Sequence, residues 1–430
     1  MKICLVSTSA YVLTGYSKVS YYLLRELRKV PDLQVYHFTL NSSTLAPVRP
    51  VLDGITTKDN YEDAPAFAGL QEFCEGNGFG KEDVVFIYND LGYIGTFLEK
   101  WTPPRLWVYV DTVAHGIPPP LLKLIDDKAE RIYLFNDYWK SVYPFEKARV
   151  LEHGVDKDVF HPLTKEKTDE IREKLGVPKD AIVFLNANRN SRRKRIDLTI
   201  SAFVQFCKRN PKKVAYLLLI TGGEGYYDIG TVLYNEIARH KHDCSKRVLS
   251  INTSKILLTD PIINEFYNVA DYGINTSTGE GYGLTALEHA SVGKPQVLTF
   301  LPQYESFITK RNAVFVPPLA DREYYDRTDW SGSYHDTWSS ADICTAMENV
   351  LGKSCIFKAK SWEEVCADFI TTLGTAPAPA GVESSVSIDL PSFPIHNDHH
   401  TGHQGQSPPP VSPHPDCVSG RRVRSLSTSH

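Results

Sequence analysis

The chain of 430 residues is long enough for two ordinary domains, and its 42% hydrophobic and 23% charged content is typical of a globular protein. Its formal net charge of −4 gives no overall attraction to nucleic acid or to an anionic membrane. Eight cysteines without a C-x-x-C pair favour reduced thiols over a disulfide framework, which predicts a cytoplasmic protein.

The sequence has no apolar stretch long enough to span a bilayer. The longest candidate, Val214–Ile220, is far shorter than the roughly 20 residues that a transmembrane helix needs. The short apolar run in Met1–Val6 is too brief for the core of a signal peptide. We therefore predict no transmembrane segment, while peripheral contact with a membrane stays open.

The first 150 residues alternate between strand and helix patterns. Apolar runs predict strands over Ile3–Val6, Leu33–Phe38, Val84–Tyr88, Leu106–Val110 and Ile132–Phe135. A stripe of apolar residues predicts a helix over Tyr16–Val30, whereas residues 40–80 show no clear pattern. Polar residues end several of these strands, and Asp111 and His115 follow one of them. Such a pattern indicates a parallel sheet with a polar carboxyl edge.

A second series of strands and helices follows. The predicted strands are Ile182–Asn186, Ala215–Ile220, Tyr272–Ile274 and Val297–Phe300, and the predicted helices are Leu198–Cys207, Ile262–Val269 and Ala341–Leu351. A capping box formed by Ser361 and Glu364 begins a last helix. We interpret Glu323–Ser339 as a surface loop. From Gly374 onward Pro, Ser, Gly and His dominate, which predicts disorder.

The segment Asn275–Pro295 has the pattern of an anion site. A short strand leads into a loop with three glycines, at 279, 281 and 283, and then into a helix. Backbone N–H groups at such a helix start attract a phosphate, and glycine lets it approach closely. Glu280 and Glu288 lie on either side of the helix start. The alternative is an ordinary turn of a parallel sheet in which both acids are solvated.

A basic run between a strand and a helix could supply the cations for a phosphate. Arg189 and Lys194 lie just past the strand end, and both can bind a diphosphate. Two alternatives exist for the run 192–195, namely a nuclear import or RNA-contacting segment and a solvated face. The D-x-D sequence 156–158 lies in a linker far from any strand end, so we assign it no metal.

The sixteen residues E-G-Y-G-L-T-A-L-E-H-A-S-V-G-K-P, which run from Glu280 to Pro295, resemble a known donor-site signature. The signature is that of the retaining GT-B-fold glycosyltransferases of the E-x7-E family (glycosyl transferases group 1). Tyr282 replaces the usual Phe and His289 the usual Ala. The spacing of Arg189, Lys194 and Asp197 also resembles this family, with Arg195 in place of Gly. The segment Arg149–Pro162 resembles its inter-domain passage, with His153 in place of Asn.

The resemblance implies an α/β fold of two Rossmann-like doubly wound domains that face each other across a cleft. The expected parts are an N-terminal acceptor domain (1–152), a nucleotide-sugar donor domain (153–357), a terminal helix that packs back on the N-terminal domain (358–373), and a disordered tail (374–430).

The resemblance also implies transfer of a sugar from a UDP- or GDP-linked donor to a saccharide, glycan or glycolipid, with retention and without a metal, a cofactor or a nucleic-acid partner. The implied catalytic residues are Glu280, Arg189, Lys194, Asp111 and His115. The implied donor-binding residues are Gly15, Tyr16, Arg189, Lys194, Thr259, Gly281, Tyr282, Gly283, Leu284 and Glu288. Among these, Glu288 would bind the ribose and Glu280 the donor sugar.

Other functions remain open at this point. The chain could be a sugar-nucleotide-binding or epimerising protein, or a non-catalytic pseudo-enzyme scaffold. An RNA-binding protein would use the basic run 192–195. Paired carboxylates also occur in glycoside hydrolases, but these enzymes need no phosphate site, so the pattern around Arg189 and Lys194 disfavours them.

Overall fold

The structure is a computed structural model that describes residues 1–40, 42, 46–60, 67–113, 116–221, 225–252, 257–325 and 333–374. The described residues all belong to one compact unit. His115 and the predicted disordered tail beyond Gly374 lie outside the described residues. None of the helices in the described ranges is long and apolar enough to cross a membrane.

The first half of the chain forms a seven-stranded parallel sheet with the order β3-β2-β1-β4-β5-β6-β7. Its strands are β1 (Lys2–Thr8), β2 (Gln34–Leu40), β3 (Ile55–Lys58), β4 (Val84–Asp90), β5 (Leu106–Asp111), β6 (Arg131–Leu134) and β7 (Ala148–Val150). The central strands are buried on both faces, which explains their continuous apolar runs. The order 3-2-1-4-5-6 is that of a Rossmann fold.

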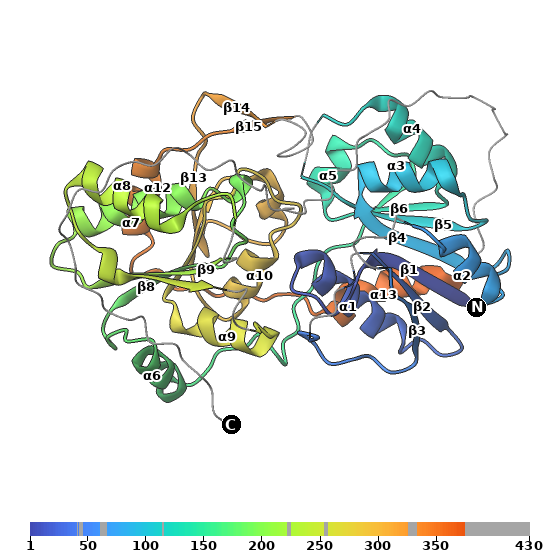
Figure 1. The fold of residues 1–430 in the computed structure, drawn as a ribbon, viewed down its shortest axis with the longest axis horizontal. Helices are drawn as coiled ribbons and strands as arrows, with labels where there is room; N and C mark the ends of the chain where they lie inside the picture. Colours follow the sequence, from blue (N-terminus) through green and yellow to red (C-terminus); the bar gives the residue numbers. More distant parts are fainter. Residues whose placement is uncertain are drawn as a thin grey trace, which may run out of the picture. The chain divides into compact units, whose positions relative to one another are not determined.

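Helices cover both faces of this first sheet. They are α1 (Gly15–Leu27), α2 (Leu70–Gly76), α3 (Leu91–Lys100), α4 (Pro119–Lys128) and α5 (Asp137–Val142). Helix α1 lies on one face and helices α3 and α4 on the other (Figure 1). Helix α1 begins where the Thr14 hydroxyl accepts a hydrogen bond from the N–H of Ser17.

The second half repeats the plan with a six-stranded parallel sheet in the order β10-β9-β8-β11-β12-β13. Its strands are β8 (Ile182–Asn186), β9 (Ala215–Thr221), β10 (Val248–Asn252), β11 (Tyr272–Asn275), β12 (Gln296–Thr299) and β13 (Ala313–Val316). The helices are α6 (Lys165–Lys174), α7 (Ile196–Arg209), α8 (Ile229–His240), α9 (Asp260–Val269), α10 (Leu284–Ser291) and α12 (Ser340–Asn349). Helices α9 and α10 lie on the face opposite α7 (Figure 1). Both halves therefore have the Rossmann-like doubly wound plan that we predicted.

The prediction of a surface loop over Glu323–Ser339 is wrong for the described residues. The strands β14 (Arg322–Tyr325) and β15 (Ser333–Asp336) pair antiparallel, and His335 of β15 is only 5% exposed. Trp338 follows β15 and donates its indole N–H to the carbonyl of Val316. Aromatic residues favour such a pairing because alternate side chains can be buried and exposed.

The last described helix, α13 (Trp362–Thr371), returns to the first sheet and lies beside α1 in Figure 1. Its capping box is present as predicted, with Ser361 and Glu364 bonded to each other's backbone N–H. Trp362 stacks on Tyr22 at 5.2 Å between ring centroids, and Phe369 stacks on Phe86 at 5.1 Å. The end of the described chain therefore contributes large aromatic side chains to the first core.

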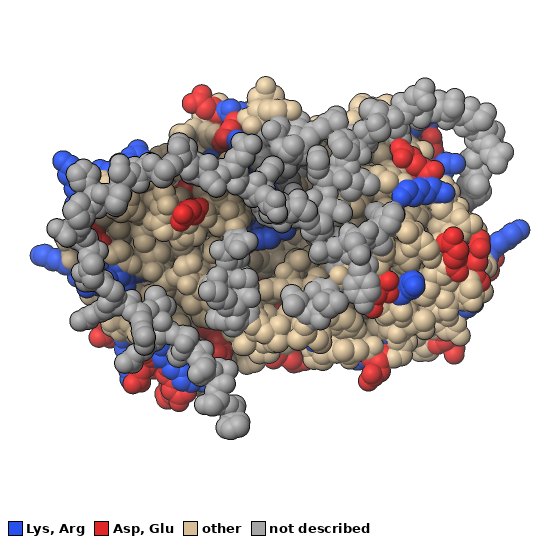
Figure 2. Space-filling view, viewed as in Figure 1, with Lys and Arg blue, Asp and Glu red and all other residues tan. Residues whose placement is uncertain are grey.

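Surface charge is mixed on the face that Figure 2 shows. Acidic and basic side chains are interspersed on the visible part of this face, and neither sign forms a broad area. This distribution agrees with the small formal net charge of −4. Long-range attraction of a charged partner to this face is therefore weak.

Candidate functional site

The loop between β11 and α10 is buried along its whole length. Residues 275–283 each lie below the surface, and Glu280 is only 6% exposed. Glu288 in α10 is 3% exposed. Neither acid is solvated, so the alternative of an ordinary turn with solvated acids does not describe this loop.

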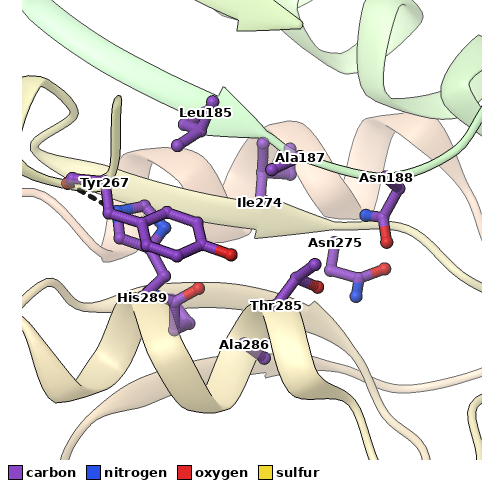
Figure 3. Close-up of a pocket in the computed structure, with 10 residues that line it drawn as sticks. Leu185, Ala187, Asn188, Tyr267, Ile274, Asn275, Thr285, Ala286 and His289 are labelled. Atoms are coloured by element: carbon purple, nitrogen blue, oxygen red, sulfur yellow. Dashed lines mark hydrogen bonds between the residues drawn. The ribbon is translucent and has the colours of Figure 1, made fainter. Parts of the chain in front are cut away.

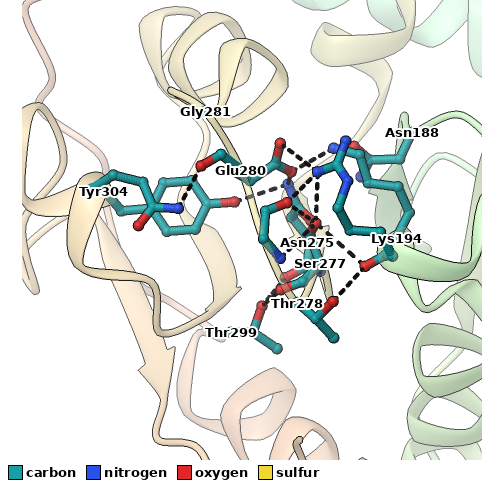
Figure 4. Close-up of polar contacts among 12 residues, drawn as sticks. Asn188, Lys194, Asn275, Ser277, Thr278, Glu280, Gly281, Thr299 and Tyr304 are labelled. Carbon is teal, nitrogen blue, oxygen red and sulfur yellow. Dashed lines mark hydrogen bonds and ion pairs between the residues drawn. The ribbon is translucent and has the colours of Figure 1, made fainter. Parts of the chain in front are cut away.

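Two cations and an amide hold Glu280 (Figure 4). Lys194 Nζ lies 2.5 Å from its Oε1 and Arg193 lies 3.4 Å from its Oε2. Asn275, at the end of β11, donates its amide N–H to Oε1 at 3.1 Å. Burial opposes ionisation, but the charges of Lys194 and Arg193 outweigh it and lower the pKa of Glu280 to about 2. Glu280 is therefore a carboxylate at neutral pH.

The basic run lies against this loop because a short helical turn, η1 (Arg192–Lys194), separates β8 from α7. The carbonyl of Arg193 accepts a hydrogen bond from the N–H of Thr278. Burial and the neighbouring Arg193 charge lower the pKa of Lys194 to about 8, although Glu280 opposes the shift. Arg192 pairs with Glu323 of β14 at 2.5 Å. These contacts disfavour a solvated face for the run.

Arg189 and Arg195 lie at the two ends of this basic segment. The side chain of Arg189 is exposed. Burial raises the pKa of Tyr16 and lowers that of Lys194, and the Arg189 charge contributes a smaller lowering to each. Arg195 has a φ of 46°, in the left-handed region that favours glycine. This conformation explains why the related pattern has Gly here. The guanidinium of Arg195 pairs with Asp197 at 2.9 Å.

The glycines of the loop permit close approach to other chain segments. A Cβ atom at Gly281 would lie 2.7 Å from the Phe135 ring and 2.8 Å from Asp111 Oδ1. Gly283 has a φ of +103°, and a Cβ there would lie 2.5 Å from the Tyr304 ring. Gly283 also caps the N-terminus of α10, where the N–H groups of the first helical turn begin.

Tyr282 lies in the interior rather than in an open site. Its ring stacks on Phe307 at 5.0 Å and lies 4.7 Å from the imidazole of His153. The ring of His153 is 5% exposed and its nitrogens have no hydrogen-bond partner in the described structure. Burial lowers the pKa of His153 to about 3, so this residue is neutral.

Asp111 is the first-sheet carboxyl that reaches this loop. It ends β5 beside Asp90, its register neighbour at the end of β4. The hydroxyl of Tyr88 donates to Oδ2 at 3.3 Å, and the hydroxyl of Tyr16 also bonds to this carboxyl. Burial, and then the nearby Asp90 charge, raise the pKa of Asp111 to about 7, although Arg193 opposes the shift. Asp111 can therefore gain or lose a proton near neutral pH.

Gly15, at the start of α1, lies near the start of α10, since a Cβ there would lie 3.8 Å from the Leu284 side chain. The structure thus brings together Gly15, Tyr16 and Asp111 from the first half with Gly281 and Leu284 from the second. The predicted site residue His115 lies outside the described residues.

Glu288 lies in a buried group of charges, the Lys18 cluster, which consists of Lys18, Arg49, Asp260 and Glu288. Lys18 Nζ lies 2.6 Å from Glu288 Oε1 and 3.3 Å from Asp260 Oδ1. Arg49 Nε lies 2.9 Å from Asp260 Oδ2. Asp260 follows Thr259, which caps α9. The cluster therefore joins α1 and the segment around Arg49 to α9 and α10.

Sequence reasoning missed Lys18, Arg49 and Arg193. Arg193 was hidden within a basic run whose other members look equivalent in sequence. Lys18 does carry a signal, because it lies four residues before Tyr22 on the stripe that we predicted to be apolar. A lysine on such a stripe indicates a buried partner.

A small pocket lies between β8, β11 and α10 and is lined in part by Asn188, Thr285 and His289 (Figure 3). His289 stacks on Tyr267 at 4.9 Å, and its Nε2 lies 3.0 Å from the Tyr267 carbonyl oxygen. Burial lowers the pKa of His289 to about 3. The unusual His289 therefore fills space beneath α10 as a neutral side chain.

No group of three or more His, Cys, Asp or Glu side chains within the described ranges is arranged to hold a metal ion. The carboxyl of Asp156, in the D-x-D sequence, instead pairs with Arg25. That the chain works without a metal remains a prediction.

Comparison with known proteins finds a family model that matches part of the chain. Residues 167–327 match the family model described as Glycosyl transferases group 1. The chain is 26% identical over 202 residues to alpha-monoglucosyldiacylglycerol synthase of Streptococcus pneumoniae, covering 46% of this chain and 41% of that protein. It is 27% identical over 176 residues to mannosylfructose-phosphate synthase of Agrobacterium fabrum, covering 40% and 36%. The match spans only about two fifths of either relative.

Solved structures share the fold over most of the chain. Sucrose-phosphate synthase from Thermosynechococcus elongatus has a TM-score of 0.60 at 15% identity, covering 87% of this chain and 94% of that one. Anabaena Alr3699/HepE in complex with UDP and glucose has a TM-score of 0.57 at 14% identity, covering 86% and 95%. The chain thus has the GT-B arrangement of two Rossmann-like domains, and its residues 167–327 are similar to Glycosyl transferases group 1 domains.

Proposed function

We propose that this protein is a retaining glycosyltransferase that moves a sugar from a UDP- or GDP-linked donor to an acceptor hydroxyl. The observation that carries the proposal is the buried carboxylate of Glu280, held by Lys194 and Arg193 where the glycine loop enters α10. This arrangement lies within the segment that matches the Glycosyl transferases group 1 model.

The donor diphosphate would lie at the start of α10. Negative charge grows on the leaving phosphate as its bond to the sugar breaks, and fixed cations and N–H groups stabilise that charge most in the transition state. Arg189, Lys194 and the N–H groups of Gly283 and Leu284 would supply this stabilisation. Glu288 would accept hydrogen bonds from the ribose, and the backbone at Thr259 would meet the base. Chemistry of this kind requires no metal.

The sugar would lie between Glu280 and Asp111. Glu280 would accept hydrogen bonds from sugar hydroxyls beside the oxocarbenium-like carbon. The acceptor oxygen would bond to that carbon on the face that the diphosphate leaves, and its proton would pass to Asp111. His115 would contact the sugar or the acceptor. The nearness of Asp111 to Gly281 supports this placement.

We further propose the domain assignment that the resemblance implies, with an acceptor domain at 1–152, a donor domain at 153–357 and a returning segment at 358–373. The acceptor is a saccharide, glycan or glycolipid. The names of the two relatives, alpha-monoglucosyldiacylglycerol synthase and mannosylfructose-phosphate synthase, are compatible with this range.

A panel of UDP-, GDP- and ADP-sugars tests the proposal by thermal shift. One donor should raise the melting temperature, and release of its nucleoside diphosphate should follow. The anomeric coupling constant in the NMR spectrum of the product then reports retention or inversion. Binding without turnover over a broad acceptor set would favour a binding protein or pseudo-enzyme. The absence of any shift would contradict a donor site.

The pH profile should show an acid limb from Asp111. Its pKa of about 7 leaves the carboxyl protonated at lower pH, so kcat/KM should fall roughly tenfold per pH unit below 7. Asp111→Asn should remove the limb and lower the rate at pH 8. Asp90→Asn removes a charge that raises this pKa, so it should move the limb to lower pH. A kcat/KM that is flat between pH 5.5 and 8 in the unmodified protein would rule out Asp111 as the proton acceptor.

A further inference from the structure

The Lys18 cluster joins the two halves of the protein through buried charges. Lys18 is 7% exposed, Arg49 and Asp260 are each 4% exposed, and Glu288 is 3% exposed. Lys18 comes from the first turns of α1, whereas its closest partner Glu288 comes from α10, 270 residues later. Burying four charges is costly unless each one is paired, and here two cations face two acids.

Each oxygen of the Glu288 carboxylate accepts one hydrogen bond and can accept another. Lys18 donates to Oε1 at 2.6 Å, and the hydroxyl of Tyr267 donates to Oε2 at 3.1 Å. A carboxylate has about four lone-pair sites, so one is left on each oxygen. The two oxygens would offer neighbouring acceptor sites to the two adjacent hydroxyls of a ribose.

Lys18 itself is held on several sides. Asp260 lies 3.3 Å from its ammonium, and the ring of Phe160 lies 4.6 Å from it. Arg49 fixes Asp260 and is fixed in turn by the Ser17 hydroxyl at 3.0 Å and by two carbonyls of the β1–α1 loop. Lys18 is therefore anchored in the first half of the chain through α1, while residues of the second half hold its ammonium.

The ionised state of the Glu288 carboxyl depends on the charge of Lys18. Burial raises the pKa of Glu288, and the nearby Asp260 charge raises it further, while Lys18 opposes both. Without the ammonium, the carboxyl would be next to another acid, with Tyr267 as its remaining hydrogen-bond donor. It could then take up a proton or turn away, and either change removes an acceptor for a hydroxyl.

We propose that Lys18 is a positioning residue for ribose recognition, which keeps the Glu288 carboxylate ionised and oriented to accept the 2′- and 3′-hydroxyls of the donor nucleotide. The inference rests on the proposed function, since it requires a nucleotide at Glu288. Because Lys18 belongs to the first half, ribose recognition depends on contact between the two halves.

Isothermal titration calorimetry with ribose and 2′-deoxyribose nucleotides tests this role. The probes are UDP with 2′-deoxy-UDP, and GDP with 2′-deoxy-GDP. The unmodified protein should bind its preferred ribose nucleotide roughly 10- to 100-fold more tightly than the deoxy form, the ratio expected for one hydrogen bond to a charged group. Lys18→Met should reduce this ratio to about twofold or less. A role in folding alone would not change the ratio.

Lys18→Met leaves two acids facing one arginine, and this imbalance can prevent folding. The double variant Lys18→Met/Asp260→Asn restores the charge balance and should show the same lost discrimination. Lys157→Met is the matched control, because Lys157 forms an exposed pair with Glu364, and it should keep the ratio of the unmodified protein.

The outcomes separate this inference from the function on which it rests. Binding of UDP or GDP with an unchanged ratio in a folded Lys18 variant overturns the inference and leaves the proposed function standing. An unmodified protein that binds neither nucleotide overturns both. A preference for the ribose nucleotide that falls only in the Lys18 variants supports Lys18 as a positioning residue.

Discussion

Replacing Lys194 by methionine should lower kcat by about 100- to 1,000-fold, the range seen when one fixed donor to a developing negative charge is removed. Lys194 is 9% exposed and lies between β8 and the loop that carries Glu280. Methionine keeps most of the aliphatic length and removes only the charge. The measurement is kcat at a saturating concentration of the donor that the thermal-shift panel identifies.

Folding should survive this change because Glu280 keeps its contacts with Arg193 and Asn275. Circular dichroism and a melting curve check this point. Lys123→Met is the matched control, since Lys123 forms an exposed pair within α4 and should leave kcat unchanged. If folded Lys194→Met retained full activity, the assignment of the donor site would be wrong.

Replacing Gly154 by alanine should destabilise the protein by about 1–3 kcal/mol, as overpacking of a tight interior does. A Cβ at this position would lie 2.5 Å from the backbone N of Trp362 and 2.6 Å from the carbonyl carbon of Ser361. These are main-chain atoms, so no rotation of a side chain can relieve the contact. The N–H of Val155, the next residue, donates a hydrogen bond to the carbonyl of Lys360, so the segments around 154 and 361 lie in direct contact.

The midpoint of urea unfolding reports this loss of stability. Gly76→Ala is a control with the same chemical change, because Gly76 ends α2 and a Cβ there meets nothing within 4 Å. That variant should be as stable as the unmodified protein or slightly more so. Equal midpoints of urea unfolding for both variants would mean that the segments around 154 and 361 are not closely packed in solution.

Local patterns predicted much of this fold, because its central strands are buried on both faces. Runs such as Val84–Tyr88 are therefore continuously apolar and easy to recognise. The short edge strand Ile55–Lys58 was not predicted, since three of its four residues are exposed and its sequence resembles a loop. The pairing of β14 with β15 was missed because charged residues interrupt its aromatic pattern.

Short motifs and the family resemblance supplied many members of the candidate site, but not the contacts between residues that are distant in the sequence. Glu280, Gly281 and Glu288 belong to one motif with fixed spacing. The partners that set their charge come from elsewhere, as Lys18 lies 270 residues before Glu288. No periodicity or spacing rule relates such distant positions, and only the three-dimensional fold places them together. The roles of the site residues remain predictions that the variants above test.

The packing of α13 on the first sheet affects how the chain folds during its synthesis on the ribosome. Phe86 and Tyr22 near the amino terminus have stacking partners in Phe369 and Trp362, which leave the ribosome last among the described elements. The first sheet can therefore form early during synthesis, but its aromatic core stays incomplete until residues 362–369 have emerged. A nascent chain stalled before residue 362 would expose these rings and become a substrate for chaperones.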